Sequence, residues 1–124
     1  MISPGGRLLA LAALSSVVAT AACRSPHVEI TVDNQTGASV QLLEVKYPSA
    51  SFGTGSLAPG AVFHYQIQVQ GSGPVSLVYT APDGAQPSIT GPELADRARG
   101  SLVIVLLPGG KAEYHFNPDE HESK

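Results

Sequence analysis

The chain has 124 residues, a net charge of −3 and one cysteine. Its length suits one domain with a single core, and a mildly acidic chain without a basic cluster is not typical of proteins that bind nucleic acid. Because one cysteine cannot pair within the monomer, an internal disulfide framework is excluded.

The first 22 residues have the layout of a secretory signal peptide. Arg7 is the only charged residue before an apolar run that starts at Leu8 and ends near Ala22. At about 15 residues, the run is shorter than the roughly 20 that a transmembrane helix needs. We therefore expect residues 1–22 to be removed during export.

The end of this run, Thr20-Ala21-Ala22-Cys23, resembles a bacterial lipobox, in which small residues lead to the cysteine that is lipidated. Thr20 stands where leucine is usual. The alternative is a plain signal peptide cut at an Ala-x-Ala-like site, which would leave Cys23 as a free thiol. The resemblance implies lipidation of Cys23 and a lipid anchor in the bacterial cell envelope, facing the periplasm or the cell surface.

The mature part begins with three segments that have strand patterns. Residues 27–33 alternate between apolar and polar side chains, as a half-buried strand does. Within residues 39–47 the apolar positions shift parity after Leu42, which predicts a β-bulge. Residues 51–57 form a short segment that contains glycine and suits a sheet edge.

The clearest strand pattern is Ala61–Gln70, where apolar side chains fall on one parity and histidine and glutamine on the other. A strict period of two is typical of a strand with one buried face. We expect a central strand in which Tyr65 and Ile67 are buried, whereas Gln66 and Gln68 are exposed.

Four strand segments and one helical segment complete the pattern. Residues 75–80 alternate, and residues 86–90 are interrupted by a proline that favours an edge. Residues 92–99 have proline near the start and glycine after the end, which predicts a one- or two-turn helix. Residues 102–107 are uniformly apolar and predict a strand buried on both faces, and residues 112–116 form the last strand.

The order of core and turn residues indicates the fold. It runs Val28-x-Ile30-x-Val32-x-Asn34-x-x-Gly37, then Val45, then Ser56-Leu57-Ala58-Pro59-Gly60 before the long alternating strand. This order, from Val28 to Asp83, resembles bacterial immunoglobulin-like adhesion and accessory modules, with the cell-adhesion-related bacterial domain nearest. The resemblance implies an all-β fold, a single immunoglobulin-like β-sandwich of about seven or eight short strands. Such modules are usually non-catalytic, so no catalytic residue is carried over.

Motifs for nucleophilic or phosphate-binding chemistry do not occur in the sequence, and we expect neither enzymatic activity nor a cofactor. The histidines offer a metal-binding alternative. His115, Asp119, His121 and Glu122 could supply nitrogen and oxygen ligands to zinc or nickel. Acidic tails that contain histidine are common without any metal, so we predict no metal site.

Aromatic side chains offer a second alternative, a glycan-binding surface. The chain has no tryptophan, and most of its tyrosines and phenylalanines are in phase with core positions. Tyr47 and Phe52, which flank residues 48–50, are the two expected to form a small exposed patch for ligand binding.

The sequence therefore divides into a signal peptide (1–22), a lipidated N-terminus and linker (23–26), a β-sandwich domain (27–116) and a polar acidic tail (117–124). We expect a small cell-envelope lipoprotein that is a non-enzymatic binding or accessory module. Its expected partners are the membrane, through the lipid, and an envelope protein or glycan, without nucleic acid. A glycan-binding or metal-binding β-sandwich is the alternative.

Overall fold

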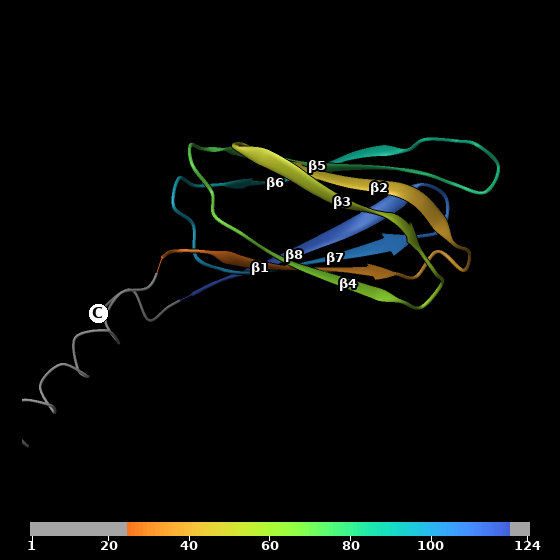
Figure 1. Cartoon of the computed structure of the whole chain (residues 1–124), viewed down its shortest axis with the longest axis horizontal. Coiled ribbons are helices and arrows are strands. Elements are labelled where there is room, and N and C mark those ends of the chain that lie inside the picture. The colour runs from red at the N-terminus through yellow and green to blue at the C-terminus, as the bar shows by residue number, and fades with distance from the viewer. Residues whose placement is uncertain (1–24, 120–124) are drawn as a thin grey trace, which may run out of the picture.

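The computed structural model describes residues 25–119, which form eight β-strands in two layers (Figure 1). The strands are β1 (Val28–Asn34), β2 (Val40–Tyr47), β3 (Ala50–Leu57), β4 (Val62–Ile67), β5 (Gly73–Thr80), β6 (Ser88–Leu94), β7 (Gly100–Leu107) and β8 (Lys111–Pro118). Four strands belong to each sheet, so the predicted all-β sandwich is confirmed.

The two sheets differ in how their strands pair. One sheet has the order β3-β2-β5-β6 and is antiparallel throughout, and the other has the order β4-β1-β7-β8. In the second sheet, β1 pairs antiparallel with β4 and parallel with β7, and β7 pairs antiparallel with β8. Among the described strands, β1–β7 is the one parallel pair.

The core lies between the sheets and is built from alternate residues of each strand. Its largest fully buried side chains are Ile30, Leu43, Leu77, Leu94, Leu102, Ile104, Leu106, Val28, Val32, Val40, Val45 and Val69. Full burial stabilises the fold by roughly 1.5–3 kcal/mol for each leucine, isoleucine or valine side chain, before the cost of ordering the chain. This apolar layer sets the spacing of the two sheets.

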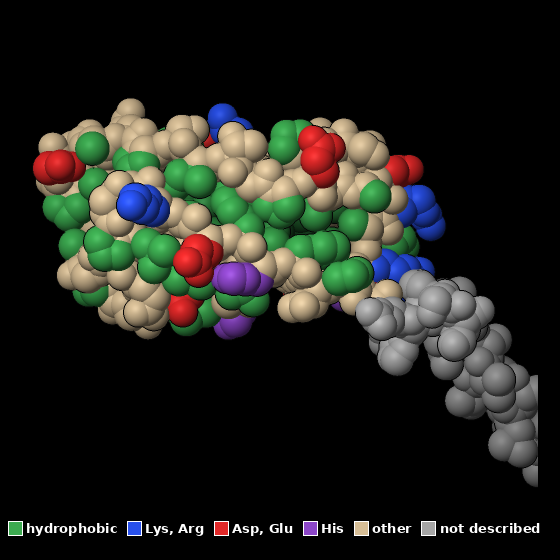
Figure 2. Space-filling model, turned by 180° about the vertical axis from the view of Figure 1, so that it is seen from behind, with side chains coloured by type: hydrophobic (Ala, Val, Ile, Leu, Met, Phe, Trp, Pro, Cys, Tyr) green, Lys and Arg blue, Asp and Glu red, His purple; other side chains and the backbone are tan. Residues whose placement is uncertain are grey.

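The outer faces of both sheets are open to solvent, which corrects the prediction for residues 102–107. Leu102, Ile104 and Leu106 are fully buried, but Val103 and Val105 point to the other face of β7 and are partly exposed. No third layer covers that face within the described chain. In Figure 2, which shows the molecule from behind, acidic and basic side chains are interspersed and do not gather into a patch of one sign.

The prediction of a central strand over residues 61–70 is wrong in its position. β4 lies at the edge of its sheet and ends at Ile67. Ile67 is buried as expected, but Tyr65 is 47% exposed because no strand among residues 25–119 lies beyond β4 to cover it. Alternation identifies the inward face of a strand, but it does not show whether the strand has a neighbour on each side.

The prediction of a short helix over residues 92–99 is also wrong. Residues 88–94 form β6, which pairs with β5 as Ile89 opposite Leu77, and a turn follows in which Arg97 takes a φ of 62°. Pairing with β5 satisfies backbone groups that one helical turn would leave without partners. Among residues 25–119 there is no helix long and apolar enough to cross a membrane.

The predicted bulge in β2 is confirmed. The register with β5 shifts between Gln41 and Glu44, and Leu42 takes a left-handed φ of 50°. This conformation turns the Leu42 side chain outward, so that it is 66% exposed, and returns Leu43 to the core. A left-handed conformation is unfavourable for a branched aliphatic residue and is held here by the strands on both sides of β2.

Tyr114 closes the side of the sandwich where β6 and β8 face each other. Its hydroxyl donates a 2.9 Å hydrogen bond to the carbonyl oxygen of Ile89, and its ring lies where a Cβ atom at Gly91 would stand. Burial raises the pKa of Tyr114 to about 12. The phenol therefore stays protonated and can donate this bond at any ordinary pH.

We expect Gly91→Ala to lower the free energy of unfolding by about 2 kcal/mol, because the added methyl group displaces the Tyr114 ring. Tyr114→Phe should cost about 1 kcal/mol, since it leaves the Ile89 carbonyl unsatisfied. Urea denaturation of both variants measures these losses.

The contribution of Tyr114 should also depend on pH. Its pKa is higher in the folded chain than the value near 10 of an unfolded tyrosine, so the stabilisation is complete below about pH 10 and is lost as pH rises toward 12. A stability profile of wild type that parallels that of Tyr114→Phe across this range would contradict the assignment.

Candidate binding groove at the end opposite the termini

The two ends of the domain differ in what they carry (Figure 1). β1 starts and β8 ends at the same end, here called the proximal end. The connections after β1, β3, β5 and β7 lie at the opposite, distal end. Loops at one end of a sandwich are where immunoglobulin-like domains place their binding residues.

A groove of about 670 Å³ opens at the distal end between the two sheets. Three connections contribute to it: the β1–β2 loop, the β5–β6 loop and the β7–β8 turn. Its lining residues are Thr36, Ala38, Val40, Tyr79, Ala81, Pro82, Asp83, Ala85, Gln86, Pro87, Leu107, Pro108, Gly109 and Gly110. This volume is in the range of sites that hold small ligands or a few residues of peptide.

The β1–β2 wall of the groove is fixed by Asn34, a fully buried polar side chain. Its Nδ2 donates to the carbonyl oxygens of Ala38 at 2.8 Å, Leu57 at 2.9 Å and Ala58 at 3.1 Å. Its Oδ1 accepts from the backbone nitrogen and the hydroxyl of Thr36 at 3.0 and 2.8 Å. One side chain thus joins the β1–β2 loop to the end of β3.

The β5–β6 wall is a closed turn with its own hydrogen bonds. The backbone nitrogen of Ala81 donates to the carbonyl of Ala85 at 2.8 Å, and that of Gly84 donates to the carbonyl of Ala81 at 2.9 Å. The carboxylate of Asp83 accepts from the backbone nitrogen of Ala85 at 3.0 Å. Gly84 has a φ of 89°, which a residue with a side chain rarely adopts.

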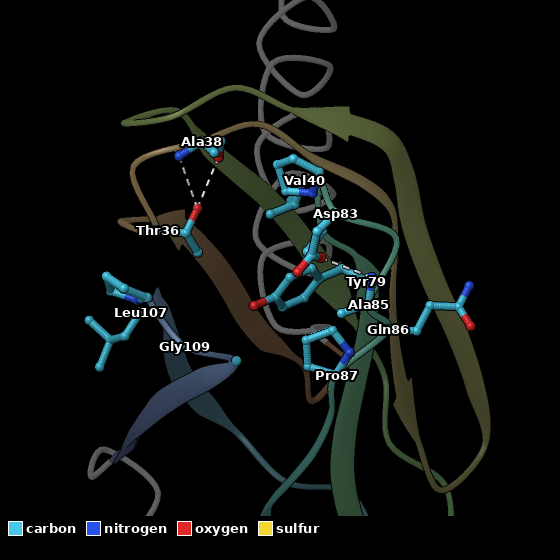
Figure 3. Close-up of a pocket in the computed structure, with 14 residues that line it drawn as sticks. Thr36, Ala38, Val40, Tyr79, Asp83, Ala85, Gln86, Pro87, Leu107 and Gly109 are labelled. Atoms are coloured by element: carbon cyan, nitrogen blue, oxygen red, sulfur yellow. Dashed lines mark hydrogen bonds between the residues drawn. The ribbon is translucent and has the colours of Figure 1, made fainter.

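Tyr79 supplies a hydroxyl group to an otherwise mainly apolar groove. Its ring is buried, and Figure 3 shows its oxygen directed into the space between Pro87 and the β7–β8 turn. Burial raises the pKa of Tyr79, so the hydroxyl remains neutral and can both donate and accept a hydrogen bond. Asp83 is the one charged side chain among the lining residues. The groove therefore suits a neutral ligand with an apolar body.

The predicted patch of Tyr47 and Phe52 exists as a contact, but its exposure differs from the prediction. The two ring centroids are 6.3 Å apart, yet Phe52 is only 7% exposed because Tyr65 of β4 stacks on it at 4.5 Å. The exposed ring on this side is Tyr65, which the alternation had placed in the core. Ligand binding by Tyr47 and Phe52 remains a prediction.

The histidines on β4 and β8 do not converge. His64 on β4 bonds the hydroxyl of Thr31 at 3.2 Å, and His115 on β8 lies 3.3 Å from Glu113 with both side chains well exposed. β1 and β7 lie between β4 and β8, so three strand spacings, roughly 14 Å, separate the two histidines. They cannot bind one metal ion together.

Only some of the remaining candidates for metal binding and lipidation lie within the described residues. Among the described residues, no group of three His, Cys, Asp or Glu side chains could hold a metal ion. Asp119 is the last described residue, whereas His121, Glu122 and the lipidation candidate Cys23 lie outside the described residues. Their roles remain predictions.

The groove was not identified from the sequence. Pro82 and Pro108 mark turns in the sequence, and the turn pattern predicts both correctly. Pro87, which the sequence predicts within a strand over residues 86–90, lies just before β6 in the β5–β6 connection. What the pattern lacks is the pairing of β1 with β7, which brings the β7–β8 turn beside the β1–β2 loop. Long-range pairing of this kind has no local signal.

Comparison with known proteins supports the fold. No protein-family model matches the chain, and no curated protein matches it. A solved structure described as the NMR structure of the protein from Eubacterium rectale is similar to it, with a TM-score of 0.54 and 14% sequence identity. The similarity covers 77% of this chain and 92% of that chain. At this identity it shows a shared fold and carries no function.

Proposed function

We propose that this protein is a small lipoprotein of the bacterial cell envelope, a binding module without enzymatic activity that presents its distal groove away from the membrane. The observation that carries the proposal is the opposition of the two ends. The chain enters and leaves the domain at the proximal end, and the groove opens at the distal end. An anchor at the proximal end would leave the groove accessible.

The linker length is consistent with this orientation. Cys23 precedes the first residue of β1, Val28, by five positions. Five residues span at most about 17 Å when fully extended, which would hold the domain close to the bilayer. A lipidated cysteine with two or more acyl chains gives stable attachment without a membrane-spanning segment.

The anchor is tested by Cys23→Ser. We expect this variant to lose fatty-acid labelling and to move from the membrane fraction to the soluble fraction, because acyl chains supply the attachment energy in this proposal. Metabolic labelling followed by fractionation measures both effects. Equal membrane recovery of the variant and wild type would contradict the anchor.

Binding at the groove is tested by photo-cross-linking in intact cells. A photoreactive residue in place of Gln86, in the groove lining, should give a discrete cross-linked product. The matched control places the same residue at Ser101, on the open outer face of the other sheet. The same product from both positions, or none from Gln86, would contradict a binding role for the groove.

A further inference from the structure

The sandwich has four edge strands, and two of them are protected against further pairing. β6 contains Pro92, and the carbonyl of its Ile89 already accepts a hydrogen bond from Tyr114. β8 carries Lys111 and Glu113 at its exposed edge. Proline and charged side chains are the devices by which natural proteins prevent the addition of another strand.

The other two edges, β3 and β4, lack these devices. β3 reads Ala-Ser-Phe-Gly-Thr-Gly-Ser-Leu, eight residues without a proline or a charged side chain. β4 reads Val-Phe-His-Tyr-Gln-Ile, where the one titratable residue, His64, bonds to Thr31 of its own sheet. Among the described strands β3 pairs with β2 alone, and the carbonyl of its Ser56 accepts a 3.3 Å hydrogen bond from the hydroxyl of Thr54. A long, uncharged edge presents its remaining backbone N–H and C=O groups to any extended chain.

An aromatic seam, made of Tyr47, Phe52, Phe63 and Tyr65, runs beside the β3 edge. Phe52 of β3 and Tyr65 of β4 stack with centroids 4.5 Å apart and ring planes 12° apart. Phe63 lies 6.1 Å from Phe52 and 6.4 Å from Tyr65. Although Tyr65 belongs to this stack, nearly half of its surface remains exposed. The seam is therefore an apolar surface that the domain itself covers only in part.

We propose that β3 binds an extended, uncharged segment of a partner protein by strand addition, and that inward side chains of this segment cover Tyr65. A strand added to β3 would extend its sheet by about 4.8 Å past the present edge. Its inward side chains would point toward the opposite sheet, where β4 and Tyr65 lie. Backbone pairing provides the affinity in this mode, and alternate side chains provide the selectivity.

Charge and geometry identify the occupant as a partner segment. Residues 119–124 of this chain contain four charged side chains, which an uncharged edge does not complement, and they follow β8 at the far edge of the other sheet. A second copy that paired its own β3 antiparallel would turn the two proximal ends in opposite directions. Two copies arranged in this way could not both be anchored in one membrane. This argument rests on the proposed function, whereas the β3 edge and the aromatic seam are features of the domain that do not depend on it.

The test uses the purified full chain and an uncharged peptide of about nine residues, acetyl-Ser-Val-Thr-Val-Gln-Val-Thr-Val-Ser-amide, as the probe. Amide NMR signals of β3 and ring signals of Tyr65 should shift on titration. Two further peptides are N-methylated. In one of them all valines carry the N-methyl group, and in the other the residues between the valines carry it. Because a strand pairs through one edge only, one methylated peptide should bind at least about tenfold more weakly and the other should bind like the parent.

A substitution in β3 tests the same binding mode independently of the peptides' methylation. Thr54→Lys places a charge on the inward face of β3, and Asn117→Lys places the same charge on β8 as the matched control. We expect Thr54→Lys to weaken the peptide by at least about tenfold, whereas Asn117→Lys leaves it unchanged. A thermal melt checks that the Thr54→Lys protein is folded. If this variant is unfolded, the binding of the methylated peptides to the wild-type protein tests the proposal instead.

Three results would overturn the proposal. They are the absence of shifts at β3 with the parent peptide, equal loss of binding with both methylated peptides, and a dimer that sedimentation shows to be blocked by Thr54→Lys. The last would identify a second copy as the occupant. None of these results depends on lipidation of Cys23, so they are distinguishable from failure of the proposed function.

Discussion

Asn34→Asp is expected to lower the free energy of unfolding by about 4 kcal/mol at neutral pH, although the two side chains have nearly the same shape. The amide nitrogen donates to three carbonyl oxygens, those of Ala38, Leu57 and Ala58. A carboxylate oxygen in its place would face the same three carbonyls without a proton to donate. Chemical denaturation of the purified chain measures the loss.

The sign of the pH dependence separates this cause from a general loss of packing. Burial among carbonyl groups would raise the pKa of the introduced carboxyl group above the value near 3.9 of an unfolded aspartate. Part of the loss should therefore be recovered as pH falls from about 7 toward 4, because the protonated group can donate one bond again. A deficit that stays constant over this range would contradict the assignment.

Asn117→Asp is the matched control. Asn117 lies on β8 with an exposed side chain, so the same chemical change should alter stability by no more than about 0.5 kcal/mol. Asn34 also fixes the β1–β2 wall of the groove through its bonds to Thr36. Cross-linking from the groove should therefore decrease in Asn34→Asp even where enough folded protein remains.

The sequence predicts the faces of the strands well and their neighbours poorly. Ile30 and Leu77 are buried as their alternation requires, since side-chain direction along a strand is a local property. Whether a strand lies at a centre or an edge depends on pairing between distant segments. For this reason the same pattern that correctly placed Ile67 in the core placed Tyr65 there incorrectly.

The aromatic side chains show the same limit. Phe52 belongs to a strand with two glycines, which favours an edge, and β3 is an edge. The sequence predicts exposure of Phe52 from its place beside residues 48–50, but Tyr65 from the opposite sheet covers it. Because the stack joins residues of different sheets, no spacing within the sequence encodes it. The same holds for the groove, whose walls come from three separate connections.

Gly53→Ala is expected to destabilise the domain by about 3 kcal/mol or more, the second large effect. A Cβ atom at Gly53 would collide with the carbonyl oxygen of Leu43 on β2. The obstacle is backbone and cannot rotate away as a side chain does. Leu43 follows Leu42, whose left-handed conformation accompanies the register shift of β2. Removing the collision would therefore require the bulge itself to rearrange.

Gly55→Ala provides a control on the same strand, two residues away. No atom of the described part of the chain lies within 4 Å of a Cβ atom at Gly55, and its φ is not in the left-handed range. An alanine there reduces the freedom of the unfolded chain without strain in the folded one, so we expect a gain of about 0.5 kcal/mol. Urea denaturation of the two variants should thus give changes of opposite sign. Losses of similar size at both positions would mean that β3 needs its glycines for flexibility, and that the approach of the Leu43 carbonyl is not the cause.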